Sequence, residues 1–241
     1  MHTFYLPAAD WGAQATLPLA EAKHAAQVLR LPQGETVRLL DGQGREGLFR
    51  LASVGKKTVV VHLLEETIHQ PPAARAVIAL ALSKAVRRGF FMEKAVELGA
   101  HEIWLWQGDH SQGRLPNDAA ESYEGQMIAG IKQSGNPWMP QVRACPKGIA
   151  EVISLAATAD HRLLPWEQQH DVPLLGLENM GKAGVTVYVI GPEGGFSERE
   201  LGLLRGADFL PVSLGQRILR CETAATLCLG LHWWASQQPR A

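Results

Sequence analysis

A change of pattern at Pro71-Pro72 constrains the fold more than any other feature of this chain. After the proline pair, continuous apolar runs such as residues 76–82 and 185–190 alternate with segments of helical periodicity. Continuous apolar runs of this length are typical of strands buried on both faces. Because a proline pair ends both helices and central strands, we place a domain boundary there. The alternation predicts an α/β domain with a parallel sheet over residues 72–241.

The first seventy-one residues have a different character. Residues 36–40 and 47–51 flank the sequence Asp41-Gly42-Gln43-Gly44, which predicts a β-hairpin. A short apolar start (4–6), a small helix (19–31) and a β-rich run (58–64) complete the pattern. Several short strands in so short a span predict a small β-barrel domain over residues 1–71.

The expected elements of the second domain follow one another at short spacing. Its strands are predicted at 76–82, 103–106, 162–164, 185–190 and 209–212, and its helices at 84–98, 118–133, 148–157, 197–204 and 222–234.

Composition excludes several classes of protein. The chain of 241 residues has 23 Lys and Arg against 24 Asp and Glu, so it is not a histone-like protein that coats nucleic acid. Three cysteines without a Cys-x-x-Cys spacing argue against a disulfide framework or a zinc site, and we expect no metal. The start lacks the pattern of a signal peptide, and the longest apolar run (223–235) contains His232. These features predict a cytoplasmic protein that does not enter a membrane.

Two glycine-containing loops carry the strongest functional signal. The strand expected at 185–190 runs into Gly191-Pro192-Glu193-Gly194-Gly195-Phe196, and Ser197 with Glu200 forms a capping box for the next helix. Its spacing matches neither a dinucleotide-binding motif nor a phosphate loop. Glycines allow the main chain to approach a ligand, and ligands favour the carboxyl ends of parallel strands. A tight strand-to-helix turn without a ligand remains the alternative.

The second loop follows the strand expected at 209–212. It contains Leu214-Gly215, then Arg217 and Arg220, and leads into the last helix at Glu222. An arginine near a helix start can stabilise an anionic group, whereas Glu222 also suits a purely structural role as an acid in the first turn. Arg217 is equally compatible with a solvated position. Two such loops at successive strand ends favour one shared pocket.

A third candidate is the basic start of the helix expected at 84–98. Lys84, Arg87 and Arg88 form a candidate phosphate-contacting patch in a nearly neutral chain. The alternative is a solvated helix face on which Glu93 and Glu97 form local ion pairs.

Taken together, these segments resemble a known family. The matching residues are 80–84, 91–99, 190–196 and 214–224, together with 24–32 and 40–44 near the start of the chain. They are similar to the ribosomal RNA small subunit methyltransferase E family, the uridine N3-methyltransferase branch of the SPOUT superfamily. Residues 24–32 and 40–44 resemble the PUA-like RNA-binding barrel of that family, which makes Arg30 a candidate RNA contact.

The resemblance implies a SPOUT domain with a deep trefoil knot at its C-terminal end, S-adenosylmethionine (SAM) as cofactor, and a homodimer. It implies methylation of N3 of a specific uridine in 16S ribosomal RNA, acting on the small ribosomal subunit. Carried over by position, the expected cofactor-binding residues are Leu164, Gly191, Pro192, Glu193, Gly194, Leu214, Gly215, Ile218, Leu219 and Arg220.

Three segments depart from the family pattern. His2-Thr3 stands where an arginine is common, Asn136 replaces the arginine of a Gln-Ser/Cys-Gly-Arg segment, and residues 109–112 replace a Ser-Glu-Arg-Ser loop. We expect these positions to face RNA and not the cofactor loops.

Methylation of N3 of uracil requires loss of a weakly acidic proton, so the site needs a base or a cation that stabilises the anion. We expect Arg220 to stabilise the anion. Glu222 is a second catalytic candidate as base, ranked lower because the helix dipole stabilises its carboxylate and makes it a poor proton acceptor. Two alternatives stay open: a SPOUT enzyme acting on another RNA position or on a ribose 2′-hydroxyl, and an RNA-binding relative without activity.

Overall fold

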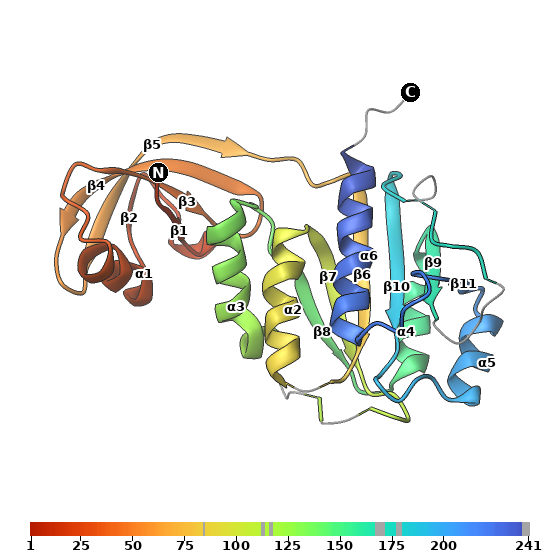
Figure 1. Cartoon of the computed structure of the whole chain (residues 1–241). Helices are drawn as coiled ribbons and strands as arrows, with labels where there is room; N and C mark the ends of the chain where they lie inside the picture. Colours follow the sequence, from red (N-terminus) through yellow and green to blue (C-terminus); the bar gives the residue numbers. More distant parts are fainter. Residues whose placement is uncertain (84, 112–113, 116–117, 167–171, 177–179, 238–241) are drawn as a thin grey trace. The chain divides into compact units, whose positions relative to one another are not determined.

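The computed structural model describes residues 1–83, 85–111, 114–115, 118–166, 172–176 and 180–237, and its contacts divide the chain into two units (Figure 1). The first unit comprises Met1–Pro71 and Ile128–Met139, and the second comprises Pro72–Met127 and Pro140–Ala241. The sequence did not suggest that residues 128–139 would join the first unit. One reason is the Nζ atom of Lys132, which lies 2.9 Å from Oε1 of the buried Glu21.

A curled five-stranded sheet forms the first unit. Its strands are β1 (Thr3–Tyr5), β2 (Gln14–Thr16), β3 (Thr36–Leu40), β4 (Arg45–Val54) and β5 (Val59–Ile68), in the order β1-β3-β4-β5-β2. The predicted hairpin is present as the antiparallel pair β3–β4. Phe4 of β1 and Ala15 of β2 belong to one hydrophobic core although these strands are the two edges of the sheet, so the sheet curls as expected for a small barrel.

The N-terminal part of the first unit also contains two helical pieces. A 3₁₀ turn spans Ala8–Asp10, and α1 (Leu19–Lys23) continues into a π-helical turn at His24–Val28. The helix predicted before Pro32 is therefore present, although its second half has a different winding.

The second unit is a six-stranded parallel sheet covered by helices, as the alternation of apolar runs predicted. The strands are β6 (Ala74–Ala81), β7 (Ala100–Trp106), β8 (Gln141–Cys145), β9 (His161–Pro165), β10 (Gly184–Ile190) and β11 (Leu210–Val212), in the order β11-β9-β10-β6-β7-β8. The helices are α2 (Ala85–Glu97), α3 (Ala119–Ser134), α4 (Ile149–Leu155), α5 (Glu198–Gly206) and α6 (Cys221–Ser236), with a 3₁₀ turn at Ala156–Thr158. Residues 128–134 of α3 belong to the first unit. None of the helices in the described ranges is both long and apolar enough to cross a membrane.

Successive side chains of the central strands serve opposite faces of this sheet. Val187 and Val189 of β10 join the core beneath α4 and α5. Tyr188 points to the other face, where α2 and α6 lie (Figure 1), and its hydroxyl lies 3.1 Å from Nδ1 of His232 on α6. Burial of both faces explains why the strand reads as one continuous apolar run.

His232 gives this core a pH dependence. The residue is 4% exposed, and burial, with a smaller contribution from nearby His161, lowers its pKa to about 4. The unfolded chain takes up a proton near the ordinary value of 6.5, whereas the native state resists protonation until about pH 4. His232 therefore does not reduce the free energy of unfolding at pH values above 6.5, and this free energy falls as the pH drops from 6.5 toward 4. We expect a loss of about 2 kcal/mol at pH 5 from this group.

Urea unfolding at pH 7.5 and pH 5 measures this loss. The variant His232→Gln keeps a polar partner for Tyr188 but does not titrate, so its stability should change less between the two pH values. An equal loss in the variant and in the wild type would contradict the assignment to His232.

Candidate functional site

An open pocket lies at the carboxyl ends of three neighbouring strands, β11, β9 and β10. Because all strands of the sheet are parallel, the loops that follow them meet at one edge, where α/β proteins bind ligands. The pocket encloses a volume of about 630 Å³ when the open space at its mouth is included. Its walls come from the end of β9, the turn after β10, the loop before α6 and the start of α6.

The structure brings most of the predicted cofactor residues into this pocket. From the two loops, Gly191, Pro192, Glu193, Leu214, Gly215, Ile218 and Leu219 line it. The prediction of one shared pocket for the two loops therefore agrees with the geometry. Sequence reasoning missed further lining residues, namely Pro165, Trp166, Ile190, Gly195, Phe196, Arg217, Cys221 and Ala224. Pro165 and Trp166 directly follow the predicted Leu164 at the end of a strand, which is the signal that could have identified them.

Leu164 is a correction to the predicted set. It is fully buried in the core beneath α4 and α5, and it is not among the residues that line the pocket. The alternation of side chains along β9 turns Leu164 toward the core, whereas Pro165 and Trp166 reach the pocket.

Gly191 and Gly194 are required by the protein's own packing. A Cβ atom at Gly191 would lie 2.7 Å from the ring of Phe196, and one at Gly194 would lie 2.8 Å from Cβ of His110. Gly194 itself is not among the lining residues. Both glycines thus allow close approach, but of side chains from the same chain.

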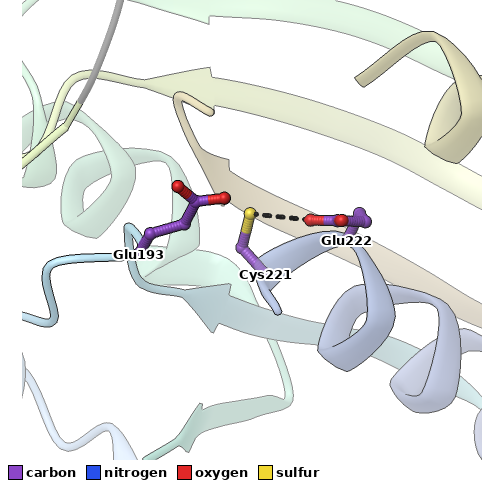
Figure 2. A group of neighbouring side chains, drawn as sticks. All are labelled: Glu193, Cys221 and Glu222. Carbon is purple, nitrogen blue, oxygen red and sulfur yellow. Dashed lines mark hydrogen bonds between the residues drawn. The ribbon is translucent and has the colours of Figure 1, made fainter. Parts of the chain in front are cut away.

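Two carboxylates and a thiol gather at the rim of this pocket. Glu193, Cys221 and Glu222 each place a polar atom within 4.8 Å of the others, and Figure 2 shows the thiol between the two carboxylates. The Cys221 thiol donates a hydrogen bond to Oε2 of Glu222 at 3.3 Å. Burial raises the pKa of Cys221 above its ordinary value, which keeps the thiol protonated and able to donate. Glu222 is 8% exposed, whereas Glu193 is exposed.

Arg220 caps α6 at the edge of the pocket. Its backbone is extended, and its exposed side chain makes no capping hydrogen bond to the helix. It is not among the lining residues, although its neighbours Leu219 and Cys221 are. Arg220 therefore lies beside the pocket and does not form its wall.

The predicted basic patch on α2 needs correction at Arg88. This side chain is 8% exposed, with its Nε donating to the hydroxyl of Tyr123 at 2.6 Å and its Nη1 donating to the carbonyl of Ser83. A buried guanidinium held by two neutral acceptors cannot contact a phosphate at the surface. Lys84 and the side chain of Arg87 lie outside the described residues. Arg30 is exposed on the first unit.

The segment that departs from the family at residues 109–112 is described as far as Ser111. The Asp109 carboxylate accepts hydrogen bonds from Arg199 at 2.7 Å and from Ser197 at 2.5 Å, and His110 lies beside Gly195. Both residues are exposed, and they also contact the turn after β10 and the start of α5. Asn136 stays near its own loop, where its Oδ1 accepts the backbone N–H of Trp138.

Comparisons with known proteins agree with this architecture. Residues 69–233 match a family model described as an RNA methyltransferase domain, and residues 18–64 match one described as an RNA methyltransferase PUA domain. Ribosomal RNA small subunit methyltransferase E from Synechocystis is 29% identical over 220 residues, which cover 90% of this chain and 72% of the relative.

Two solved structures share the fold over almost the whole chain. A Legionella pneumophila protein described as a methyltransferase, in complex with the bound cofactor SAM, has a TM-score of 0.84 and 28% identity over 97% of both chains. Ribosomal RNA small subunit methyltransferase E from Neisseria gonorrhoeae, bound to S-adenosyl methionine, has a TM-score of 0.81 and 27% identity over 95% of both chains.

Proposed function

This chain belongs to the RNA methyltransferase family, and we propose that it uses SAM to methylate N3 of a specific uridine in 16S ribosomal RNA. The observation that carries the proposal is the pocket, because both predicted glycine loops line it at the strand edge where parallel sheets bind ligands. Relatives named ribosomal RNA small subunit methyltransferase E and SAM-bound structures of the same fold support the cofactor and the substrate class. The proposal includes a cytoplasmic location, where a protein acting on a bacterial-type ribosomal subunit would meet its substrate.

The residues of the pocket suit SAM in chemical character. Pro192, Phe196 and Leu219 offer apolar contacts for an adenine ring, and the Glu193 carboxylate suits the positive charge of the methionine part. When bound, SAM supplies an electrophilic methyl group on a positively charged sulfur, which leaves as a neutral thioether.

The chain's own residues must deprotonate and orient the uracil. In the proposed mechanism the N3–H bond breaks as Arg220 stabilises the uracil anion, and the proton is released to water. The Glu222 carboxylate, whose Oε2 accepts a hydrogen bond from the Cys221 thiol, is the second and lower-ranked candidate for the proton acceptor. Arg220 stabilises the negative charge that develops on the uracil oxygens. The residues that line the pocket would hold the methyl donor so that its methyl group is aligned with N3 of the uracil.

The resemblance extends this proposal to the assembly and to RNA binding. We include in it a homodimer, a knotted C-terminal segment, and RNA contacts from Arg30, Lys84 and Arg87. Trp233 and Trp234 at the end of α6 are 43% and 54% exposed, which supports a subunit contact on this helix.

Two measurements test the proposed function. Calorimetry of the purified protein with SAM should show one site per chain, and a nucleotide-resolved map of 16S ribosomal RNA should lose one N3-methyluridine when the gene is deleted. Restoring the wild-type gene should restore the modification. Loss of a ribose methylation instead would favour the other SPOUT activity, and no heat with SAM would favour an RNA-binding relative without activity.

A further inference from the structure

The turn at residues 191–197 has a second face that the pocket does not use. One face lines the pocket, and the other packs against residues 107–111, which follow β7. A Cβ atom at Gly108 would lie 3.2 Å from Cγ of Pro192, and Nδ1 of His110 lies 3.1 Å from the carbonyl oxygen of Gly195. The turn therefore lies between the pocket on one side and, on the other side, a segment from the other half of the sheet.

Glu200 joins the two segments through a buried carboxylate. The residue is 1% exposed. Its Oε1 accepts the backbone N–H of Asp109 at 2.9 Å, and its Oε2 accepts the backbone N–H of Ser197 at 2.9 Å. The capping box predicted from the sequence uses only the second of these bonds, so the first is an additional function of the same side chain. Hydrogen bonds to a buried carboxylate are among the strong ones in proteins.

Asp109 adds a contact at the surface. Its carboxylate pairs with Arg199, two residues into α5, and accepts a hydrogen bond from the Ser197 hydroxyl. Hydrogen bonding to Arg199 lowers the pKa of Asp109, which keeps it ionised at neutral pH. Exposed ion pairs contribute little to global stability, so an effect of this pair belongs to the local geometry of the turn.

We propose that residues 107–111 and Glu200 form a positioning clamp that holds the 191–197 turn in the conformation that lines the pocket. This inference rests on the proposed function for the identity of the ligand, SAM. Asp109, His110 and Glu200 are positioning residues, because they act through the turn and do not line the pocket.

The test compares Glu200→Gln and Asp109→Ala with the wild type. Glu200→Gln replaces an acceptor oxygen by an amide group, and should raise the dissociation constant of SAM about tenfold. Asp109→Ala keeps the backbone N–H that Glu200 accepts and removes the surface contacts, and should raise it about threefold. The turnover number at saturating SAM should stay within about twofold of the wild-type value, since the clamp sets binding and not chemistry.

A matched control and a second readout make the test decisive. Glu151→Gln makes the same chemical change at the start of α4, where Glu151 accepts the backbone N–H of Lys147, and should leave SAM binding unchanged. Hydrogen exchange of the Gly195 amide, which donates to the carbonyl of Pro192, should accelerate in Asp109→Ala. Unchanged exchange and unchanged SAM affinity in both clamp variants would overturn the clamp, even if unfolding free energy fell.

The readout at Gly195 does not depend on the ligand. If the wild-type protein binds no SAM, the proposed function fails, and the exchange rate of Gly195 still decides whether the clamp exists.

Discussion

Replacing Arg220 by alanine is expected to lower the methylation rate at saturating SAM by about 10²–10³-fold, the usual cost of removing one group that stabilises developing negative charge. SAM affinity should change much less, because the Arg220 side chain is exposed and is not part of the pocket wall. Single-turnover methylation of 16S ribosomal RNA, together with calorimetry for SAM, separates the two quantities.

Two further variants identify what Arg220 does. Arg220→Lys keeps a positive charge without the planar fork, so it should recover only part of the rate. Arg143→Ala removes an exposed arginine of β8 that pairs with Glu102, and should behave as the wild type. If Arg220 stabilises the uracil anion, higher pH should partly rescue Arg220→Ala, because more of the uracil is then deprotonated. Normal turnover by Arg220→Ala would remove Arg220 from the mechanism.

The sequence predicted the fold well where one physical signal dominates. The central strands β6 and β10 are buried on both faces, which leaves the short continuous apolar runs from which both strands were predicted. The short strands β2 and β8 were missed. β2 alternates polar and apolar residues over three positions, and β8 lies at the edge of its sheet with several polar side chains, so neither carries such a run.

Features that depend on long-range packing were beyond sequence reasoning. The membership of residues 128–139 in the first unit depends on contacts such as Lys132 with Glu21, which are 111 positions apart. The inward position of Arg88 depends in the same way on Tyr123 and on the carbonyl of Ser83. From sequence alone, an arginine on a helix is predicted to be exposed, because its hydrogen-bond partners on other elements are not known.

At the site, sequence reasoning located the loops but explained their glycines differently. It connected Gly191 and Gly194 with the approach of a ligand, whereas the structure places Phe196 and His110 against them. The motif fixes a turn with small residues, but it does not say which neighbour occupies the space. This distinction leads to a second large effect.

Replacing Gly191 by alanine is expected to lower the catalytic efficiency toward SAM by about 10²-fold, because small misplacements at a site carry penalties of this size. The new Cβ atom would lie 2.7 Å from the Phe196 ring, closer than real contacts permit. The Phe196 ring stacks on Trp106 with centroids 6.0 Å apart, so it cannot retreat in that direction. The Phe196 ring must therefore shift in another direction, and because this ring is part of the pocket wall, the shift changes the shape of the pocket.

The stability of this variant should change far less than its activity. Overpacking costs about 1–3 kcal/mol, and a ring at the pocket rim can yield without disturbing the core. Gly202→Ala in α5 is the matched control, because nothing lies within 4 Å of its added Cβ and alanine favours a helix by about 0.5–1 kcal/mol. Calorimetry with SAM and urea unfolding measure both quantities in both variants.

A double variant tests whether Phe196 transmits the effect. Leucine at position 196 is shorter than phenylalanine, so adding Phe196→Leu to Gly191→Ala should restore part of the SAM affinity that the single change removes, although Phe196→Leu alone weakens binding. Such non-additivity is the signature of two residues in direct contact. Additive losses would mean that the alanine acts on the ligand itself, and Gly191 would then be a residue that SAM approaches directly, as the sequence first indicated.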